Sequence, residues 1–243
     1  MEILFATDGS RGAAIALELL SGLPLGHRDR VTAISAAVDP AHLPAARAAA
    51  DAAAQRLLAA GIAARAVVAR GAPVPSIVER LVSAPADLLV AGSRGLGVVS
   101  GTLLGSVSRA LAAHAPAPLL VVGERADVPR HILVASDGSD EAEQALEIVE
   151  RIPLPQDARS SRWRLQDGPR SADQTVREAH ARGADLLALG FAAARRAHPP
   201  LLPGLIETVL AHAHCAVLIA TPPLAPRLDQ RPVLERTVIC PAG

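Results

Sequence analysis

The chain has 243 residues, enough for one large or two small domains, and half of them are hydrophobic, so a sizeable core can form. Its formal net charge is zero, which gives no electrostatic footprint for nucleic acid or an anionic membrane. Two cysteines are too few for a disulfide framework, and we find neither a signal-peptide pattern nor an apolar run of membrane-spanning length. We therefore expect a cytoplasmic protein without a membrane span.

The first 123 residues alternate short apolar runs, typical of buried strands, with longer segments typical of helices. The predicted strands are Ile3–Ala6, Val31–Val38, Ala64–Ala69, Leu88–Ala91 and Leu119–Val122. The predicted helices between them are Arg11–Leu23, Leu43–Ala60, Pro73–Val82 and Ser106–His114. This alternation predicts parallel βαβ units and hence an α/β fold.

A glycine-rich loop, residues 92–105, joins the strand that ends at Ala91 to the helix that begins at Ser106. Glycines allow backbone N–H groups to approach an anion closely, and a helix start offers unpaired N–H groups and the positive end of the helix dipole. Arg94 adds a charge, and Ser106 and Ser108 add hydroxyl groups. The loop is therefore suited to holding phosphate; the alternative is a loop that only turns the chain.

Three phosphate-binding patterns can be compared with this loop. A P-loop requires a lysine, and the chain contains none. A dinucleotide fingerprint, G-x-G-x-x-G, begins at Gly95 but has Ser100 in place of its last glycine, with Glu124 as a candidate ribose acid. The third pattern, G-x2-G-x9-G-[ST], is met in full by Gly92, Gly95, Gly105 and Ser106.

This last spacing resembles that of the ATP-binding members of the universal stress protein family. The resemblance implies a Rossmann-like fold of the adenine nucleotide alpha hydrolase type, with a parallel five-stranded sheet in which strand 1 lies beside strand 4. In such sheets ligands bind beyond the carboxyl ends of the strands, where the strand order reverses. The resemblance implies that ATP, or AMP or ADP, binds there, with or without Mg²⁺.

The resemblance also implies which residues contact the nucleotide. Asp8 would face the adenosine end, since a carboxylate can accept from sugar or base donors but repels phosphate, although Asp8 could instead be only a helix cap. Ala37 would meet the adenine through its backbone, and the helix start would hold the phosphates. The expected contact residues are Ala6, Thr7, Asp8, Ala37, Ala91, Gly92, Arg94, Gly95, Gly105, Ser106, Val107 and Ser108.

A second, shorter copy of the pattern follows. Ile132–Ser139 repeats Ile3–Ser10 at an offset of 129, and Ala184–Gly190 repeats Ala86–Gly92 at an offset of 98. The difference, 129 − 98 = 31 residues, is about one strand plus one helix, so we predict a reduced sheet without the second strand and second helix. The predicted division is a first domain at 1–123, a linker at 124–130, a degenerate domain at 131–221 and a tail at 222–243.

The second copy departs from the phosphate-binding spacing. Ala193 stands in place of Gly95, and Pro203, which has no N–H to donate, stands in place of Gly105. We therefore predict one nucleotide site, in the first domain. His212-x-His214-Cys215 could suggest zinc, but a fourth ligand is not evident.

Each copy ends in an apolar strand, Leu119–Val122 and Val217–Ala220, and exposed apolar edges favour pairing. We predict that these two strands pair and form an intramolecular pseudo-dimer; a homo-oligomer and an added strand at Thr237–Cys240 are left open. The family resemblance implies a nucleotide-linked regulatory protein of the stress response. The alternatives are a weak ATPase or nucleotide-transfer enzyme of the same fold, and an interaction module without a ligand.

Overall fold

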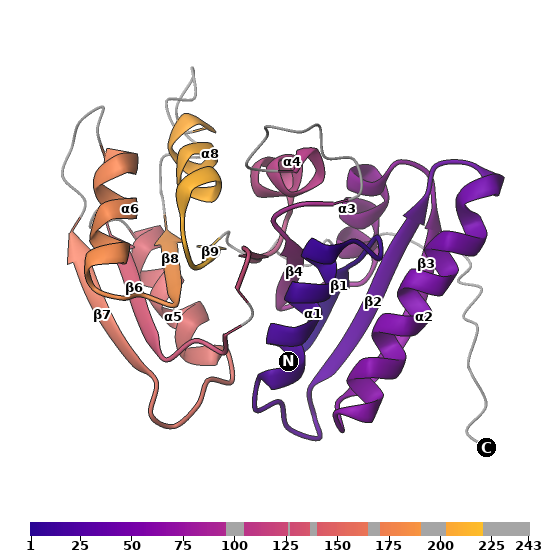
Figure 1. Ribbon diagram of the computed structural model, residues 1–243, viewed down its shortest axis with the longest axis horizontal. Coiled ribbons are helices and arrows are strands. Elements are labelled where there is room, and N and C mark those ends of the chain that lie inside the picture. Colours follow the sequence, from indigo (N-terminus) through magenta and orange to yellow (C-terminus); the bar gives the residue numbers. More distant parts are fainter. Residues whose placement is uncertain (96–104, 126, 137–139, 165–170, 191–202, 221–243) are drawn as a thin grey trace.

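The two halves of the chain share one nine-stranded sheet with helices on both faces (Figure 1). The computed structural model describes residues 1–95, 105–125, 127–136, 140–164, 171–190 and 203–220. No helix in these ranges is long and apolar enough to cross a membrane.

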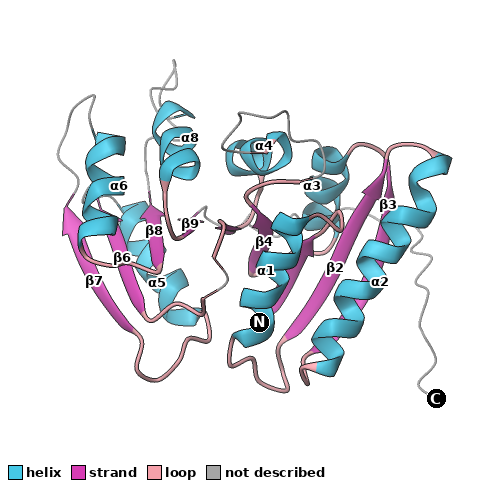
Figure 2. Cartoon of the chain, viewed as in Figure 1, coloured by secondary structure: helices cyan, strands magenta, loops and turns pink. Residues whose placement is uncertain are grey.

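The first repeat contains five strands and the helices that connect them (Figure 2). The strands are β1 (Glu2–Ala6), β2 (Arg30–Ala37), β3 (Ala63–Arg70), β4 (Leu88–Gly92) and β5 (Leu119–Val122). The helices are α1 (Arg11–Gly22), a 3-10 turn (Pro40–His42), α2 (Leu43–Ala59), α3 (Pro73–Ser83) and α4 (Ser106–His114). These elements agree with the predicted segments to within a few residues.

The described part of the second repeat contains four strands and three helices. The strands are β6 (His131–Ser136), β7 (Arg159–Arg164), β8 (Leu186–Gly190) and β9 (Ala216–Ala220). The helices are α5 (Asp140–Arg151), α6 (Ser171–Ala181) and α8 (Pro203–His212). Thr237–Cys240, considered above as an added strand, lies outside the described residues.

The strand order is β3-β2-β1-β4-β5-β9-β8-β6-β7. Neighbours within each repeat are parallel, whereas β5 and β9 are antiparallel, with Leu120 opposite Leu218 and Val121 opposite Val217. The predicted pairing of the two final strands is therefore confirmed. Because each of these strands covers the edge of the other, apolar residues at both edges are removed from water.

The prediction that the second repeat lacks the second strand is wrong. β7 pairs with β6 from Arg159 opposite His131, just as β2 pairs with β1 from Arg30 opposite Glu2. Both positions differ by the same offset, since 131 − 2 and 159 − 30 are each 129, so β7 is the counterpart of β2. The elements without a described counterpart are those equivalent to α2 and β3. The error arose because β7 carries the polar, exposed sequence of an edge strand, which hid its place beside β6.

Two apolar layers cover the two faces of the sheet, and each extends through both repeats. α1, α2 and α5 supply one layer, and α3, α4, α6 and α8 supply the other. In β4, Leu88 and Val90 face the first layer while Leu89 and Ala91 face the second. This is why an alternating polar pattern is missing from β4: a parallel strand inside the sheet is buried on both sides.

Candidate functional site

The candidate site lies where two neighbouring strands of the first repeat end together. Ala6 of β1 lies opposite Ala91 of β4, at the carboxyl ends of both strands. On the other side of β1, the Thr7 N–H donates to the Ile34 carbonyl of β2 at 2.9 Å. The strand order therefore reverses between β1 and β4, which confirms the predicted neighbours. Ligands of open α/β sheets bind at such a reversal.

Asp8 follows β1 and begins the turn into α1. Its Oδ1 accepts a hydrogen bond from the Ser10 N–H at 2.9 Å, and Ser10 Oγ in turn accepts from the Ala13 N–H at 3.2 Å, capping α1. Gly9 between them has φ +74°, a conformation that favours glycine. Asp8 thus has the turn role considered as the alternative, while its side chain is still exposed at the edge where a ligand would bind.

The glycine loop passes very close to this turn. A Cβ on Gly95 would lie 2.5 Å from Asp8 Oδ2, so only glycine fits there without a shift. A Cβ on Gly92 would lie 2.4 Å from the backbone carbon of Gly12 in α1. Packing alone therefore requires a glycine at position 92, because β4 and the first turn of α1 are in close contact there. Gly97 and Gly101 lie outside the described residues.

The start of α4 is held over the end of β4. The Gly105 N–H donates to the Ser93 carbonyl at 2.8 Å, and the Ser93 N–H donates to the Val122 carbonyl of β5 at 2.7 Å. Ser108 is buried and its hydroxyl donates to the Gly92 carbonyl at 2.6 Å. Ser106 is exposed in the first turn. The first-turn N–H groups of α4 are the ones that a helix leaves without intrahelical acceptors, and they begin at this same edge.

Arg94 makes a contact that the sequence did not reveal. Its Nη1 lies 2.6 Å from Glu124 Oε1, and its carbonyl accepts from Ser10 Oγ at 3.3 Å. The sequence suggests Glu124 only as a ribose acid. The signal for this ion pair is that Arg94 and Glu124 carry opposite charges and follow β4 and β5, which are adjacent strands. The pair ties the glycine loop to the first residue of the predicted linker.

Ala37 lies one strand away, at the carboxyl end of β2. Its carbonyl accepts a hydrogen bond from the Gly71 N–H at 2.9 Å, which uses one lone pair of that oxygen. The structure thus brings together Ala6, Asp8, Ala91 and Gly95. The start of α4 lies beside them, because the Gly105 N–H donates to the carbonyl of Ser93, which follows β4. An adenine contact at Ala37 stays a prediction.

The second repeat offers fewer of these features in its described part. β8 ends at Gly190, and α8 begins at Pro203, which occupies the place of Gly105 without an N–H. Asp137 and Ala193 lie outside the described residues. In the part of the chain that the structure describes, no three His, Cys, Asp or Glu side chains gather as metal ligands would.

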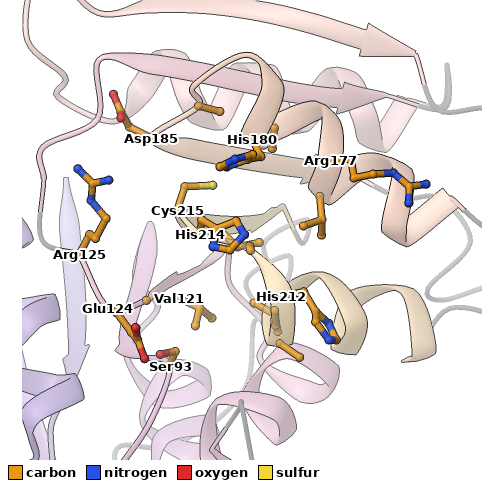
Figure 3. A pocket seen from close by; sticks show the side chains of 18 of the residues that line it. Ser93, Val121, Glu124, Arg125, Arg177, His180, Asp185, His212, His214 and Cys215 are labelled. Carbon is orange, nitrogen blue, oxygen red and sulfur yellow. The ribbon is translucent and has the colours of Figure 1, made fainter.

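A hollow beside the site lies between the repeats and was not foreseen from the sequence. A cavity of about 900 Å³ opens beside Ser93 and Arg94 and is walled mainly by α6, α8 and the start of β9 (Figure 3). Cys215 lies in its wall, and burial, together with the charge of Asp185, raises the pKa of the Cys215 thiol to about 11. The Cys215 thiol is therefore protonated and unreactive at neutral pH.

A parallel α/β sheet with a glycine loop at the reversal of strand order places the protein among Rossmann-like folds of the nucleotide alpha hydrolase type. The family model described as "Universal stress protein family" matches residues 1–123, half of the chain. The chain belongs to the universal stress protein family.

Curated relatives match over shorter stretches. A universal stress protein of Thermus aquaticus is 42% identical over 57 residues, which is 24% of this chain and 42% of that protein. A universal stress protein of Mycobacterium tuberculosis is 40% identical over 86 residues, 34% of this chain and 26% of that protein. The chain thus spans less than half the length of these relatives.

The likeness of the fold extends over both repeats. The solved structure of a universal stress protein from Archaeoglobus fulgidus matches with a TM-score of 0.68 at 20% identity, covering 90% of this chain and 97% of that one. Because the match includes nearly all of both chains, the two-repeat arrangement is shared as well as the single-repeat fold.

Proposed function

We propose that the first repeat binds ATP, or another adenine nucleotide, at the edge where β1 and β4 end, and that the bound nucleotide regulates contacts of the protein. The observation that carries the proposal is the approach of the Gly95 backbone to the Asp8 carboxylate beside the start of α4. This arrangement offers an acceptor for sugar or base donors and helix N–H groups for an anion within one edge.

Charge decides which end of the nucleotide lies where. Phosphates beside Asp8 would be repelled by its carboxylate, so the adenosine end belongs on that side. The first turn of α4, Ser106 to Ser108, has N–H groups and the positive end of the helix dipole, which favour phosphate. The Ser108 hydroxyl already donates to the Gly92 carbonyl, so its contribution to a phosphate would come from its backbone. Mg²⁺ would bridge the phosphates themselves.

The ion pair between Arg94 and Glu124 supplies a regulatory mechanism. Arg94 belongs to the glycine loop and Glu124 begins the segment between the repeats. A phosphate group competes with the Glu124 carboxylate for the Arg94 guanidinium, because both are anions that a guanidinium binds well. Nucleotide binding would thus release Glu124 and change the surface between the two repeats.

The proposal is tested by calorimetric titration with ATP and Mg²⁺, preceded by mass spectrometry of small molecules released from the denatured protein. We expect one site per chain, since Pro203 replaces Gly105 in the second repeat. Two equal sites would contradict the assignment to the first repeat, and no binding would contradict the proposal. Phosphate release from ATP, measured in parallel, would identify an ATPase.

Gly105→Pro tests the place of the phosphates. Proline removes the N–H that donates to the Ser93 carbonyl, so the start of α4 moves away from the end of β4. We expect ATP affinity to fall at least about tenfold, because this movement takes the first-turn N–H groups of α4 away from the phosphates, and each hydrogen bond to a charged group contributes about 1.5–3 kcal/mol. Gly105→Ala keeps this N–H and is the matched control. Unchanged affinity in folded Gly105→Pro would place the phosphates elsewhere.

A further inference from the structure

The cavity between the repeats has the size and position of a binding site for a small molecule. Its volume of about 900 Å³ falls within the range of ligand pockets, about 300–1,000 Å³, which are often found between domains. Val121 and Gly123 of the first repeat and residues of α6, α8 and β9 of the second repeat line it. A ligand there would touch both halves of the chain.

The inner wall of the cavity is apolar. Val121 and Val217, which lie opposite each other in the β5–β9 pair, meet there with Leu210 of α8 and Val176 of α6. These side chains belong to the apolar layer that continues through both repeats. Such a wall favours the apolar body of a ligand, because the apolar surface of the ligand is removed from water there.

The outer part of the cavity carries basic side chains. Arg177 is exposed, and no hydrogen bond or ion pair joins it to another described residue. His180, His212 and His214 also line the cavity and are exposed; the rings of His180 and His214 lie 5.1 Å apart between centroids, whereas Arg177 extends from α6 away from these two rings (Figure 3). The Nδ1 of His212 lies 2.9 Å from the Thr208 carbonyl, one turn earlier in α8.

Acidic side chains also face this space, but two of the three have partners. Glu124 is paired with Arg94, and Asp185 Oδ2 accepts from the backbone N–H groups of Arg130 and His131, each at 3.1 Å. Asp173 is exposed in the first turn of α6, where the helix dipole favours a negative charge. Arg177 differs from these acidic residues. Its charge has no partner among the described residues and does not lie at a helix N-terminus.

We propose that this cavity binds a small organic anion with an apolar body, such as an aromatic carboxylate or sulfonate. The apolar wall holds the body, and Arg177 pairs with the anionic group, since a guanidinium presents a planar fork of donors that matches a carboxylate or sulfonate. The site is distinct from the edge of β1 and β4, although Ser93 and Arg94 border both. Its occupant would hold the two repeats together.

The test uses 8-anilinonaphthalene-1-sulfonate, an aromatic sulfonate whose fluorescence rises in apolar surroundings, titrated into the full chain with and without saturating ATP. We expect one saturable site that stays available at saturating ATP, with an affinity changed only by the release of Glu124, which borders the cavity. Arg177→Glu should weaken binding at least about tenfold, because it replaces the charged donor by a repelling carboxylate. Arg47→Glu, the same change at an exposed residue of α2, is the matched control and should leave binding unchanged.

Ala213→Phe provides a second variant, which reduces the volume of the cavity by placing a ring beside its wall. We expect it to abolish the probe signal while the thermal unfolding of the protein stays cooperative. Displacement of the probe by ATP, or unchanged binding in Arg177→Glu, would overturn the proposal whether or not Ala213→Phe folds. Binding of several probes per chain at similar affinity would overturn it too, because it would indicate general apolar surface.

Discussion

Asp8 has two roles that substitutions can separate. Its Oδ1 accepts from the Ser10 N–H and fixes the turn into α1, and its carboxylate charge lies beside Gly95 at the candidate nucleotide edge. Asp8→Asn keeps an acceptor oxygen for the turn and removes the charge, whereas Asp8→Ala removes both. We expect both variants to weaken adenosine and ATP binding by about tenfold, a typical loss for hydrogen bonds to a charged group.

The stability of the two Asp8 variants should differ. Loss of the turn in Asp8→Ala should lower the free energy of unfolding by about 1 kcal/mol, as for other caps, while Asp8→Asn should stay close to the parent protein. Calorimetry with adenosine and urea denaturation measure the two effects. If Asp8→Asn binds adenosine as the parent does, the charge of Asp8 does not contribute to binding.

Cys215 gives a pH-dependent prediction. Burial first, and the charge of Asp185 second, raise its thiol pKa to about 11. At pH 8 the thiolate fraction is then about one in a thousand, against about one in ten for an unperturbed thiol with a pKa of 9.0, because each pH unit below the pKa lowers this fraction tenfold. We expect alkylation of Cys215 by iodoacetamide, followed by peptide mapping, to be about a hundred times slower in the native protein than in urea.

The same shift sets the sign of a stability change. A raised pKa in the folded state means that the unfolded chain loses this proton first, so the contribution of Cys215 to stability is complete below pH 9 and is lost as the pH rises toward 11. Cys215→Ser, which does not titrate there, should show a smaller loss of stability between these pH values. Equal alkylation rates in native and unfolded chains would contradict the burial of this thiol.

At the scale of elements, the contact between β4 and α1 depends on glycine. A Cβ on Gly92 would lie 2.4 Å from Gly12 C and 2.8 Å from the Ala13 nitrogen, and neither backbone atom can turn away. Gly92→Ala should therefore lower the free energy of unfolding by about 1–3 kcal/mol, the usual cost of overpacking. Gly204→Ala in α8, where nothing lies within 4 Å, is the control and should be neutral or slightly stabilising in urea denaturation. An unchanged stability of Gly92→Ala would mean that α1 does not pack against β4 this closely.

Strand and helix periodicity predicted the elements of the first repeat well, because its inner strands are buried on both faces and read as apolar runs. β7 was misassigned for the opposite reason: Arg159–Arg164 is largely exposed, and an edge strand without an apolar face gives little signal of its neighbours. The repeat offset of 129 would have placed it, since the register to β6 follows that offset. The spacing pattern of the glycine loop indicated the edge, but not the partners of Arg94 and Ser108, which depend on how the ends of β4 and β5 meet.

At the scale of the whole molecule, the β5–β9 pair makes one sheet of two repeats. Both apolar layers continue across it, so opening the pair would expose core residues of both repeats. The second repeat has a smaller described sheet, but its final strand keeps the apolar residues that the pair requires. The retention of this strand has a physical reason that does not involve nucleotide: without β9, the buried edge of β5 would face water.

The strength of this contact can be measured with a double-mutant cycle on Val121 and Val217, which lie opposite each other and are each only 2% exposed. Each Val→Ala change should lower the free energy of unfolding by about 1.5–3 kcal/mol, since it removes two buried carbons and leaves a small cavity. Because the two side chains touch across the pair, the double variant should deviate from additivity by at least about 0.5 kcal/mol.

Val31→Ala combined with Val217→Ala is the control. Val31 is equally buried, but β2 is four strands from β9, a distance of about 19 Å, so the effects of these two changes on the free energy of unfolding should add. Urea denaturation of the full chain, followed by circular dichroism, should show one transition in every variant. Strict additivity for Val121 and Val217, or two separate transitions, would show that the repeats fold independently and that the pair contributes little to holding them together.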